Sequence, residues 1–278
     1  MTDQFSQGIS IEKFSIKKSD FNAIQLYDQA TRSHRDEAHT FHILEKGSIV
    51  IEIDFQQYEI LAPSVVYMHP NQVHRILDFS NVTVCSLALK NENLNPTYLD
   101  FLEEIVPVKP LALTKDTYIN ISDTFSLCLK FSTLKNNKLY HLLLKDSCNA
   151  LLVLIVSTFL NQNKYSDKLS RAGLITKYFK QLLEKNYHTI KRPTQYAKSL
   201  NISTHYLNES VKYSTGSSVS QHIKDRIILE AKRLLYHTDK SVKEISFELG
   251  YEDYPYFSRL FSKTAGMSAI TFRNKRHD

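Results

Sequence analysis

One pattern occurs twice between Thr194 and Arg273, and this duplication constrains the fold more than any other feature. The first copy occupies residues 196–216 and the second residues 245–266. Leu200 corresponds to Leu249 at a spacing of 49 residues, and Leu207 to Phe257 at a spacing of 50, so the second turn is one residue longer. Repeat arrays need three or more copies to bury a core. Two copies therefore predict two linked modules.

Each copy predicts a helix, a tight turn and a second helix. A residue suited to left-handed backbone ends the first helix, and a residue with a short oxygen-bearing side chain follows to cap the second. These residues are Asn201 and Ser203 in the first copy, and Gly250 and Asp253 in the second. The second helix of each copy carries an apolar pair four residues apart, either Leu207 and Val211 or Phe257 and Phe261. Such a pair predicts a helix with one buried face.

The opposite face of each second helix is polar, as in a helix-turn-helix whose second helix enters the major groove of DNA. The candidate DNA-binding residues are Ser203, Thr204, His205, Asn208, Glu209, Lys212, Tyr254, Pro255, Ser258, Arg259, Lys263 and Arg273. Geometry suits Asn208 to adenine, Arg259 to guanine and Glu209 to the cytosine amino group. The cations Lys212, Lys263 and Arg273 are candidates for phosphate contact. The alternative is an ordinary helical hairpin with a solvated face, but the matching cap, turn and core favour DNA binding.

The segment from about Gly173 to Arg273 resembles the DNA-binding domain of AraC/XylS-type bacterial transcription regulators. The matching strings are 200–203, 206–207, 215–216, Arg226, 231–235, 244–245, 249–253, 256–261, Gly266 and 272–273. Four residues depart from the family pattern: Glu209, Ser246, Pro255 and Ala269 stand where Arg, Ala, Ser and Pro are usual. Glu209 and Pro255 lie on the expected DNA-reading surface, so they affect the target sequence rather than the fold.

Charge is distributed unevenly along the chain. Residues 171–278 hold 19 Lys or Arg and 10 Asp or Glu, whereas residues 1–170 hold 16 and 19. A basic segment beside a mildly acidic one fits binding to a polyanion through one end of the protein.

The N-terminal half predicts a β domain, a sandwich or barrel, followed by helices. Short alternating runs separated by turn residues are typical of a sandwich or barrel. The expected strands are 9–16, 21–27, 40–45, 48–55, 58–61, 65–68 and 82–89, and helical segments are expected at 94–106 and 116–134. The order is similar to the cupin-like jelly roll that often precedes this DNA-binding module. We therefore expect an α+β protein, with a cupin-like β-barrel or jelly roll and a helical dimerisation segment in residues 1–165. An all-α domain with two helix-turn-helix motifs is expected in residues 170–278.

Histidines gather in the expected barrel. We expect an effector site lined by His34, His39, His42, Tyr67 and His74. A metal site would need imidazoles and a carboxylate that converge. His39 and His42 are three residues apart, so on a strand they point to opposite faces, and no His-x-His pair occurs. We therefore expect no metal and no cofactor.

Residues 138–160 predict a long helix with a continuous apolar stripe. The stripe comprises Leu144, Cys148, Leu151, Leu152, Ile155, Thr158 and Phe159. It fits either packing on the helix's own barrel or pairing with a second copy of the chain. The resemblance favours the second, so a homodimer through this helix is expected, with a linker at 161–170.

Several features predict a cytoplasmic location. The three cysteines, Cys85, Cys128 and Cys148, are scattered in apolar surroundings, which predicts buried, reduced thiols. The first 18 residues do not resemble a signal peptide. The longest apolar run, 150–156, is much shorter than the roughly 20 residues that span a bilayer, so no membrane contact is expected.

Taken with the resemblance, these patterns predict a sequence-specific DNA-binding transcription regulator that responds to an unknown small-molecule effector. Activation is expected rather than repression. The expected partners are double-stranded DNA, RNA polymerase if the protein activates, and a second copy of the chain. One alternative is a metal-dependent cupin enzyme with a helical appendage. The missing His-x-His pair and the lack of a nucleophile–base motif count against it, so no enzymatic activity is expected. A non-specific DNA-binding protein is the other alternative.

Overall fold

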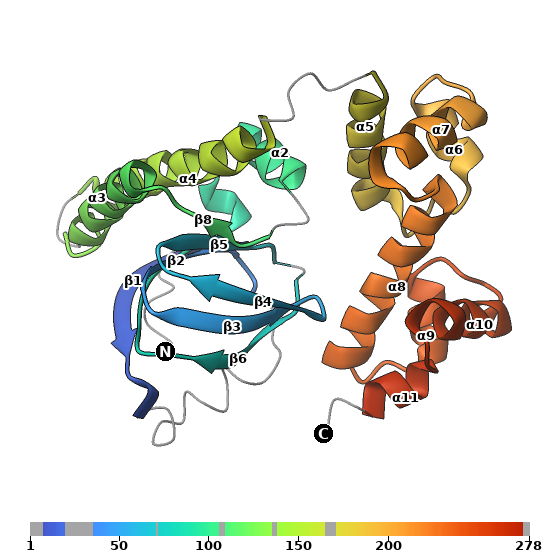
Figure 1. Cartoon of the computed structure of the whole chain (residues 1–278), viewed down its shortest axis with the longest axis horizontal. Helices are drawn as coiled ribbons and strands as arrows, with labels where there is room; N and C mark the ends of the chain where they lie inside the picture. Colours follow the sequence, from blue (N-terminus) through green and yellow to red (C-terminus); the bar gives the residue numbers. More distant parts are fainter. Residues whose placement is uncertain are drawn as a thin grey trace. The chain divides into compact units, whose positions relative to one another are not determined.

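The chain divides into two units, Met1–Tyr165 and Ser166–Asp278, which are described separately. The computed structural model describes residues 8–19, 36–70, 72–105, 109–134, 138–164 and 171–274. The first unit contains the sheets and the second is helical (Figure 1). The protein is therefore a mixed α+β chain with an N-terminal sheet unit and a C-terminal helical unit.

The strands of the first unit lie close to the predicted runs. Their bounds are β1 Ile9–Ile16, β2 His39–Lys46, β3 Ser48–Ile53, β4 Gln56–Leu61, β5 Ser64–Met68, β6 His74–Phe79, β7 Val82–Leu89 and β8 Leu111–Ala112. The sequence did not predict β6 or β8, because β6 opens with His and Arg and β8 has only two residues. The predicted strand 21–27 lies outside the described residues. Gly47 confirms the predicted turn between β2 and β3, with a φ of 84°.

The strands form two antiparallel sheets. One has the order β1-β7-β2-β5-β8 and the other β4-β3-β6. Leu44, Val66 and Val84 of the larger sheet share a core with Ile51 and Ile60 of the smaller one. Among the described residues no strand pairing joins the two sheets, so the predicted barrel is not closed. The turn at Gly47 carries the chain from one sheet to the other, and this makes a sandwich with open edges.

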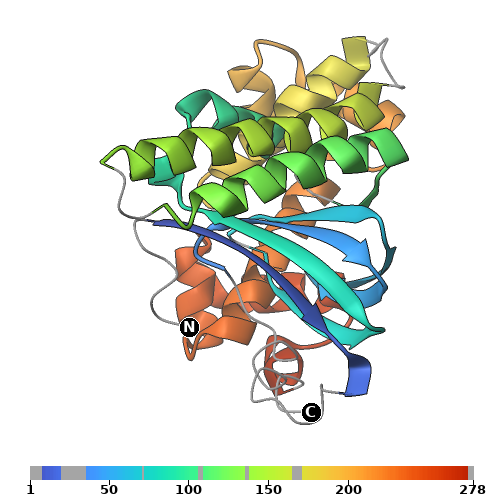
Figure 2. The ribbon, with the colours of Figure 1, turned by 90° about the vertical axis from the view of Figure 1, so that its left-hand side faces the viewer.

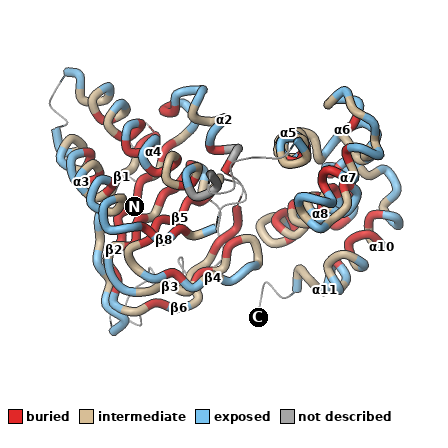
Figure 3. The backbone as a smooth tube through the Cα atoms, turned by 45° about the horizontal axis from the view of Figure 1, so that its top comes forward, coloured by how far each residue is buried: buried red, intermediate tan, exposed pale blue. Residues whose placement is uncertain are grey.

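Three helices complete the first unit: α2 Pro96–Glu104, α3 Lys115–Phe131 and α4 Tyr140–Lys164. Helices α3 and α4 lie side by side over the five-stranded sheet (Figure 2). Phe125 of α3 and Leu151 and Ile155 of α4 share one core with Phe41 and Leu87 of the strands. Figure 3 shows buried segments along α4 and along the strands. The apolar stripe of α4 is therefore buried inside its own unit, and the prediction that this stripe pairs two copies is wrong. All three cysteines are buried and free, as predicted.

Helix α4 differs from the prediction in two further respects. It continues to Lys164, so residues 161–164 are helical rather than linker, and residues 165–170 lie outside the described part of the chain. The segment Tyr140–Asn161 has a mean hydropathy of 1.6, which is long and apolar enough to cross a membrane by length and composition. The count of consecutive apolar residues missed this, because isolated polar residues interrupt the segment. A buried core helix passes the same test, and 44% of the segment is buried here.

The second unit consists of helices packed around one core. Their bounds are α5 Arg171–Asn186, α6 Pro193–Ser199, α7 Thr204–Thr215, α8 Val219–His237, α9 Val242–Glu248, α10 Tyr254–Ala265 and α11 Ala269–Asn274. One face of α8, with Ile223, Ile227 and Ala231, is buried among residues from α5, α7, α9 and α10. On α5, Leu174 and Tyr178 are 42% and 53% exposed.

We expect a Leu151→Ala variant to lower the free energy of unfolding by about 2–5 kcal/mol, because it leaves a cavity beneath α4. A Leu127→Ala variant is the matched control, because Leu127 lies on the neighbouring helix α3 and is 47% exposed. It should change stability by less than about 0.5 kcal/mol. Urea denaturation of the full chain, followed by circular dichroism, measures both. Equal losses in the two variants would show that the buried stripe does not hold α4 on the sheet.

Candidate nucleic-acid interface

Helices α6 and α7 form the first helix pair. Asn201 between them has a φ of 53°, the left-handed conformation predicted for this position. The Ser203 hydroxyl accepts a hydrogen bond from the Tyr206 backbone N–H at 3.1 Å and caps α7. Gly216, with a φ of 78°, ends α7. The local residues therefore set both the turn and the length of the second helix.

Helices α9 and α10 form the second helix pair, with the same construction. Gly250 has a φ of 76°, and the Asp253 carboxylate accepts from the Tyr256 backbone N–H at 2.9 Å. Gly266, with a φ of 74°, ends α10. Ser246 occupies a position where a small residue is needed, since its side chain is fully buried. Its hydroxyl donates to the Lys243 carbonyl at 2.7 Å, so the polar group is satisfied.

The outward face of α7 is polar and carries most of the predicted residues. His205, Glu209 and Lys212 are exposed, Ser203 is exposed beside them, and Thr204 is half-buried. Two tyrosines that were not predicted lie among the exposed residues of α7: Tyr206 is 37% exposed and Tyr213 is 81% exposed. The two tyrosines are seven residues apart, so helical periodicity places them on the same side of α7 and could have indicated them.

Asn208 is a correction. It is half-buried, and its side-chain oxygen accepts a hydrogen bond from the Val219 backbone N–H at 3.2 Å. Val219 is the first residue of α8, where backbone N–H groups have no partner within the helix. Recognition of adenine would need this oxygen together with the amide nitrogen. Asn208 therefore joins α7 to α8, and we withdraw it as a base-reading residue.

The outward face of α10 carries Pro255, Arg259 and Lys263, all exposed, whereas Tyr254 and Ser258 are half-buried. Arg259 forms no ion pair or hydrogen bond with any residue that the structure describes. Glu252 and Glu248 are nearby carboxylates in sequence that could pair with Arg259. Glu248 instead pairs with Lys240 at 2.6 Å, so the Arg259 guanidinium is available to a ligand.

Arg273 is a second correction among the predicted DNA contacts. It is half-buried on α11, and its guanidinium donates a hydrogen bond to the Lys240 carbonyl. This bond joins α11 to the segment between α8 and α9. A structural role therefore replaces the predicted phosphate contact.

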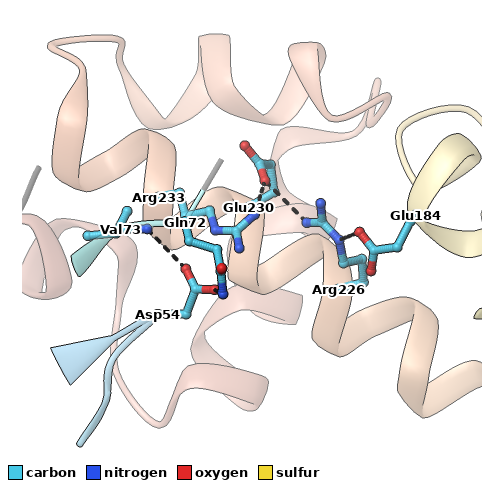
Figure 4. A network of polar contacts seen from close by, with 7 residues as sticks. All are labelled: Asp54, Gln72, Val73, Glu184, Arg226, Glu230 and Arg233. Carbon is cyan, nitrogen blue, oxygen red and sulfur yellow. Dashed lines mark hydrogen bonds and ion pairs between the residues drawn. The ribbon is translucent and has the colours of Figure 1, made fainter. Parts of the chain in front are cut away.

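A buried ion network fixes α5 against α8 (Figure 4). Arg226 Nε lies 2.7 Å from a Glu184 carboxylate oxygen, and its Nη1 lies 3.2 Å from a Glu230 oxygen. Its guanidinium stacks 3.9 Å from the Tyr187 ring centroid, and Arg233 approaches Glu230 at 3.1 Å. Burial lowers the pKa of Arg226, but the Glu184 and Glu230 carboxylates outweigh it and raise that pKa. The charge is therefore permanent, and it supports the helices that carry the reading face.

The predicted effector-site residues lie on both faces of the five-stranded sheet, so they do not all line one site, and the effector site stays a prediction. His39 and Tyr67 are buried on the helix-covered side of the five-stranded sheet, and the Tyr67 hydroxyl lies 2.7 Å from His39 Nδ1. His39 Nε2 lies 2.9 Å from the Asn91 side-chain oxygen, which can only accept, so Nε2 donates. His42 lies on the opposite face of β2. His34 lies outside the described residues.

The remaining effector candidate, His74, is buried on β6 with Nε2 3.8 Å from an Asp36 oxygen. Nearby, the Asp54 carboxylate accepts from Gln72 Nε2 at 3.0 Å and from the Val73 N–H at 3.2 Å (Figure 4). These hydrogen bonds join the turn that follows β3 to the segment that precedes β6. No group of three or more His, Cys, Asp or Glu that could hold a metal ion occurs within the described ranges.

One groove in the first unit was not predicted. It lies between α2 and α4 and has a volume of about 200 Å³. Its lining residues are Tyr98, Phe101, Leu152, Val153, Val156, Ser157 and Leu160. The groove is almost entirely apolar, so histidine clustering gave no indication of it.

Comparison with known proteins identifies the second unit. A family described as a helix-turn-helix domain matches residues 196–275, from within α6 to the end of α11. The transcriptional activator RhaR of Mannheimia succiniciproducens is 20% identical over 244 residues, covering 87% of each chain. The transcriptional activator Btr of Bacillus subtilis is 36% identical over 97 residues, which are 35% of this chain and 18% of Btr. The protein is a DNA-binding transcription regulator with a helix-turn-helix domain at residues 196–275.

Other similarities of the regulator are shorter or more distant. RhaR of Enterobacter sp. is 32% identical over 69 residues, so the match spans 24% of that relative's length. Among solved structures, unsaturated fatty acid bound ToxT of Vibrio cholerae covers 98% of the regulator and 97% of its own chain, with 15% identity and a TM-score of 0.40. The DNA-binding domain of AdpA, solved in complex with a target DNA, covers 36% of the regulator and 90% of its own chain at 23% identity, with a TM-score of 0.34.

We expect an Arg226→Met variant of the regulator to lower the free energy of unfolding of the second unit by about 3 kcal/mol or more. The substitution removes the cation that pairs with Glu184 and leaves buried Glu230 with Arg233 alone. The matched control is Lys240→Met, which removes an exposed ion pair whose side chains are 46% and 44% exposed. That control should cost less than about 1 kcal/mol. Differential scanning calorimetry of the two variants compares them. Similar small losses would show that the Arg226 network does not support the second unit.

Proposed function

We propose that the two helix pairs act as two helix-turn-helix motifs that place α7 and α10 in successive major grooves of double-stranded DNA. The observation that carries this proposal is the repetition of one geometry. Each pair has a left-handed turn residue, a side-chain cap and a second helix with one buried apolar face and one exposed polar face. Motifs linked in this way fit sites about 34 Å apart on one face of DNA.

The two reading faces differ in charge. Glu209 of α7 and Arg259 of α10 occupy corresponding positions, because Leu207 and Phe257 align. Arg259 can bond O6 and N7 of guanine together, whereas Glu209 can accept from the cytosine amino group and repels phosphate. The two half-sites therefore differ in sequence. Lys212 and Lys263 lie in the last turn of each reading helix, where they suit phosphate contact.

The names of the relatives support activation as the regulatory outcome, since RhaR and Btr are both called transcriptional activators. An activator of this type acts with RNA polymerase, in the cytoplasm. A small-molecule effector would bind the first unit, and coupling requires that it bind two states of the protein unequally. Neither alternative function gains support, because the matched relatives are transcription regulators rather than enzymes.

Selection of bound duplexes from a random DNA library by the full-length protein tests the proposal. The selected DNA should contain two different base blocks roughly one helical turn apart. A non-specific DNA-binding protein would return no enriched sequence. That result, or a single block, would refute the reading by two motifs.

Arg259→Ala and Lys263→Ala should weaken DNA binding in different ways. The Arg259 variant should lose about 1–3 kcal/mol for the selected site and its preference at one base pair. The Lys263 variant should bind all sequences more weakly, with the slope of log affinity against log salt reduced by about one. Affinities for every single-base variant of the selected site, at two salt concentrations, separate the two effects. An unchanged base preference in Arg259→Ala would exclude the guanine contact.

The outward face of α4 is the surface that we propose for a homodimer, in place of the buried stripe. Leu142, Val153 and Leu154 are 55%, 41% and 36% exposed there, and Val153 borders the apolar groove. The Leu142→Glu/Val153→Glu variant should sediment as a folded monomer. Leu127→Glu is the control, since Leu127 is 47% exposed on the neighbouring helix α3. If both variants stay dimeric, the interface lies elsewhere.

A further inference from the structure

Lys191 lies in the segment between α5 and α6 and contacts both halves of the helical unit. Its ammonium donates to the Tyr187 carbonyl at 2.6 Å, just after the end of α5. It also donates to the Leu249 carbonyl at 2.5 Å, at the end of α9. The last carbonyls of a helix have no partner within it and carry partial negative charge. The Lys191 ammonium thus donates hydrogen bonds at the C-terminal ends of both α5 and α9.

The same side chain also reaches the core of the second helix pair. The Lys191 ammonium lies 5.0 Å from the Tyr251 ring centroid, a cation–π distance. Tyr251 in turn packs on Phe257 of α10, with ring centroids 5.3 Å apart. A continuous set of contacts therefore connects the segment before the first helix pair to the reading helix of the second pair.

The backbone contact beside Lys191 is equally close. A Cβ atom on Gly250 would lie 2.2 Å from the His188 carbonyl oxygen, so no larger residue fits without moving the backbone. The 187–192 segment and the 249–251 turn therefore meet at two points, one ionic and one steric. Burial lowers the pKa of Lys191 to about 8, which agrees with an amine enclosed by protein and still protonated at neutral pH.

These contacts give the two helix pairs a connection besides α8. The second pair follows α8 through the 238–241 segment and packs on α8 in the shared core, so Lys191 adds a contact that does not pass through α8. The Arg226–Glu184 ion pair fixes α5 to α8, and Lys191 fixes the end of α5 to α9. The three attachments form a closed loop of contacts, which resists rotation of one pair against the other.

We propose that Lys191 is a positioning residue that holds the two helix pairs at one separation and thereby sets the spacing between the two DNA blocks that the protein accepts. This inference rests on the proposed reading of DNA by both pairs. A rigid reader should be sensitive to spacing, because each added base pair turns the second block by roughly 34–36° and moves it by about 3.4 Å. A loosened reader should tolerate the change but bind the correct spacing less tightly, because its second helix is no longer preorganised.

The first experiment compares Lys191→Met with Lys185→Met, which removes an exposed lysine from the neighbouring helix α5. The probes are the selected duplex and derivatives with one or two base pairs inserted or deleted between the blocks. Wild type and Lys185→Met should lose about tenfold or more in affinity when the spacing changes by one base pair. Lys191→Met should bind the native spacing several-fold more weakly and lose about threefold or less on the same change. A Lys191→Met spacing profile parallel to that of wild type would overturn the inference.

A second measurement keeps the inference independent of DNA. Spin labels at Gln195→Cys on α6 and Glu252→Cys beside α10 report the distance between the helix pairs in the full chain, and both sites are exposed. The distance distribution should be narrow with Lys191 present and clearly broader in Lys191→Met. The control variant Lys185→Met should keep the melting temperature of the wild type. Equal widths would overturn the role of Lys191. A narrow wild-type distribution without selection of any DNA sequence would instead refute the proposed function.

Discussion

The burial of one face of α8 is the constraint on which the helical unit depends. Ile223, Ile227 and Ala231 lie on that face, and their neighbours in the core come from both helix pairs, including Leu207 and Phe257. Because both reading helices bury their apolar side chains in one core, neither can change its orientation without exposing apolar surface. The outward faces of α7 and α10 are therefore polar as a consequence of packing, and their side chains are held on rigid helices.

Charged residues inside the helical unit act differently from those on its reading face. Arg226 and Lys191 are enclosed and satisfied by carboxylates, carbonyls and aromatic rings, so they hold helices together. Arg259, Lys212 and Lys263 are exposed, so their charges remain available to DNA. A basic composition alone does not distinguish these two groups. Their burial does, and it separates residues that support the site from residues that can form it.

Sequence reasoning succeeded where the signal was local. Asn201 and Gly250 were predicted from turn chemistry, and Ser203 and Asp253 from capping, because these depend on residues within one turn of the helix. It failed where the partner lies far along the chain. Asn208 accepts a hydrogen bond from the Val219 N–H, and Arg273 donates one to the Lys240 carbonyl. The spacing of neighbouring residues in the sequence predicts neither contact. The apolar stripe of α4 has the same periodicity whether it packs on its own sheet or pairs with a second copy of the chain. Periodicity alone could therefore not show that the stripe faces its own sheet. The histidines were grouped by sequence proximity, although alternation on β2 separates His39 from His42.

The central claim is that both reading helices enter the major groove at fixed positions on one face of DNA. Methylation protection of guanine N7 on the selected duplex, with the full-length protein bound, tests it most directly, because N7 lies on the floor of the major groove. We predict two separate protected blocks whose centres lie about 10–10.5 base pairs apart. Protection confined to one block, or reactivity unchanged throughout while the protein is bound, would contradict the account.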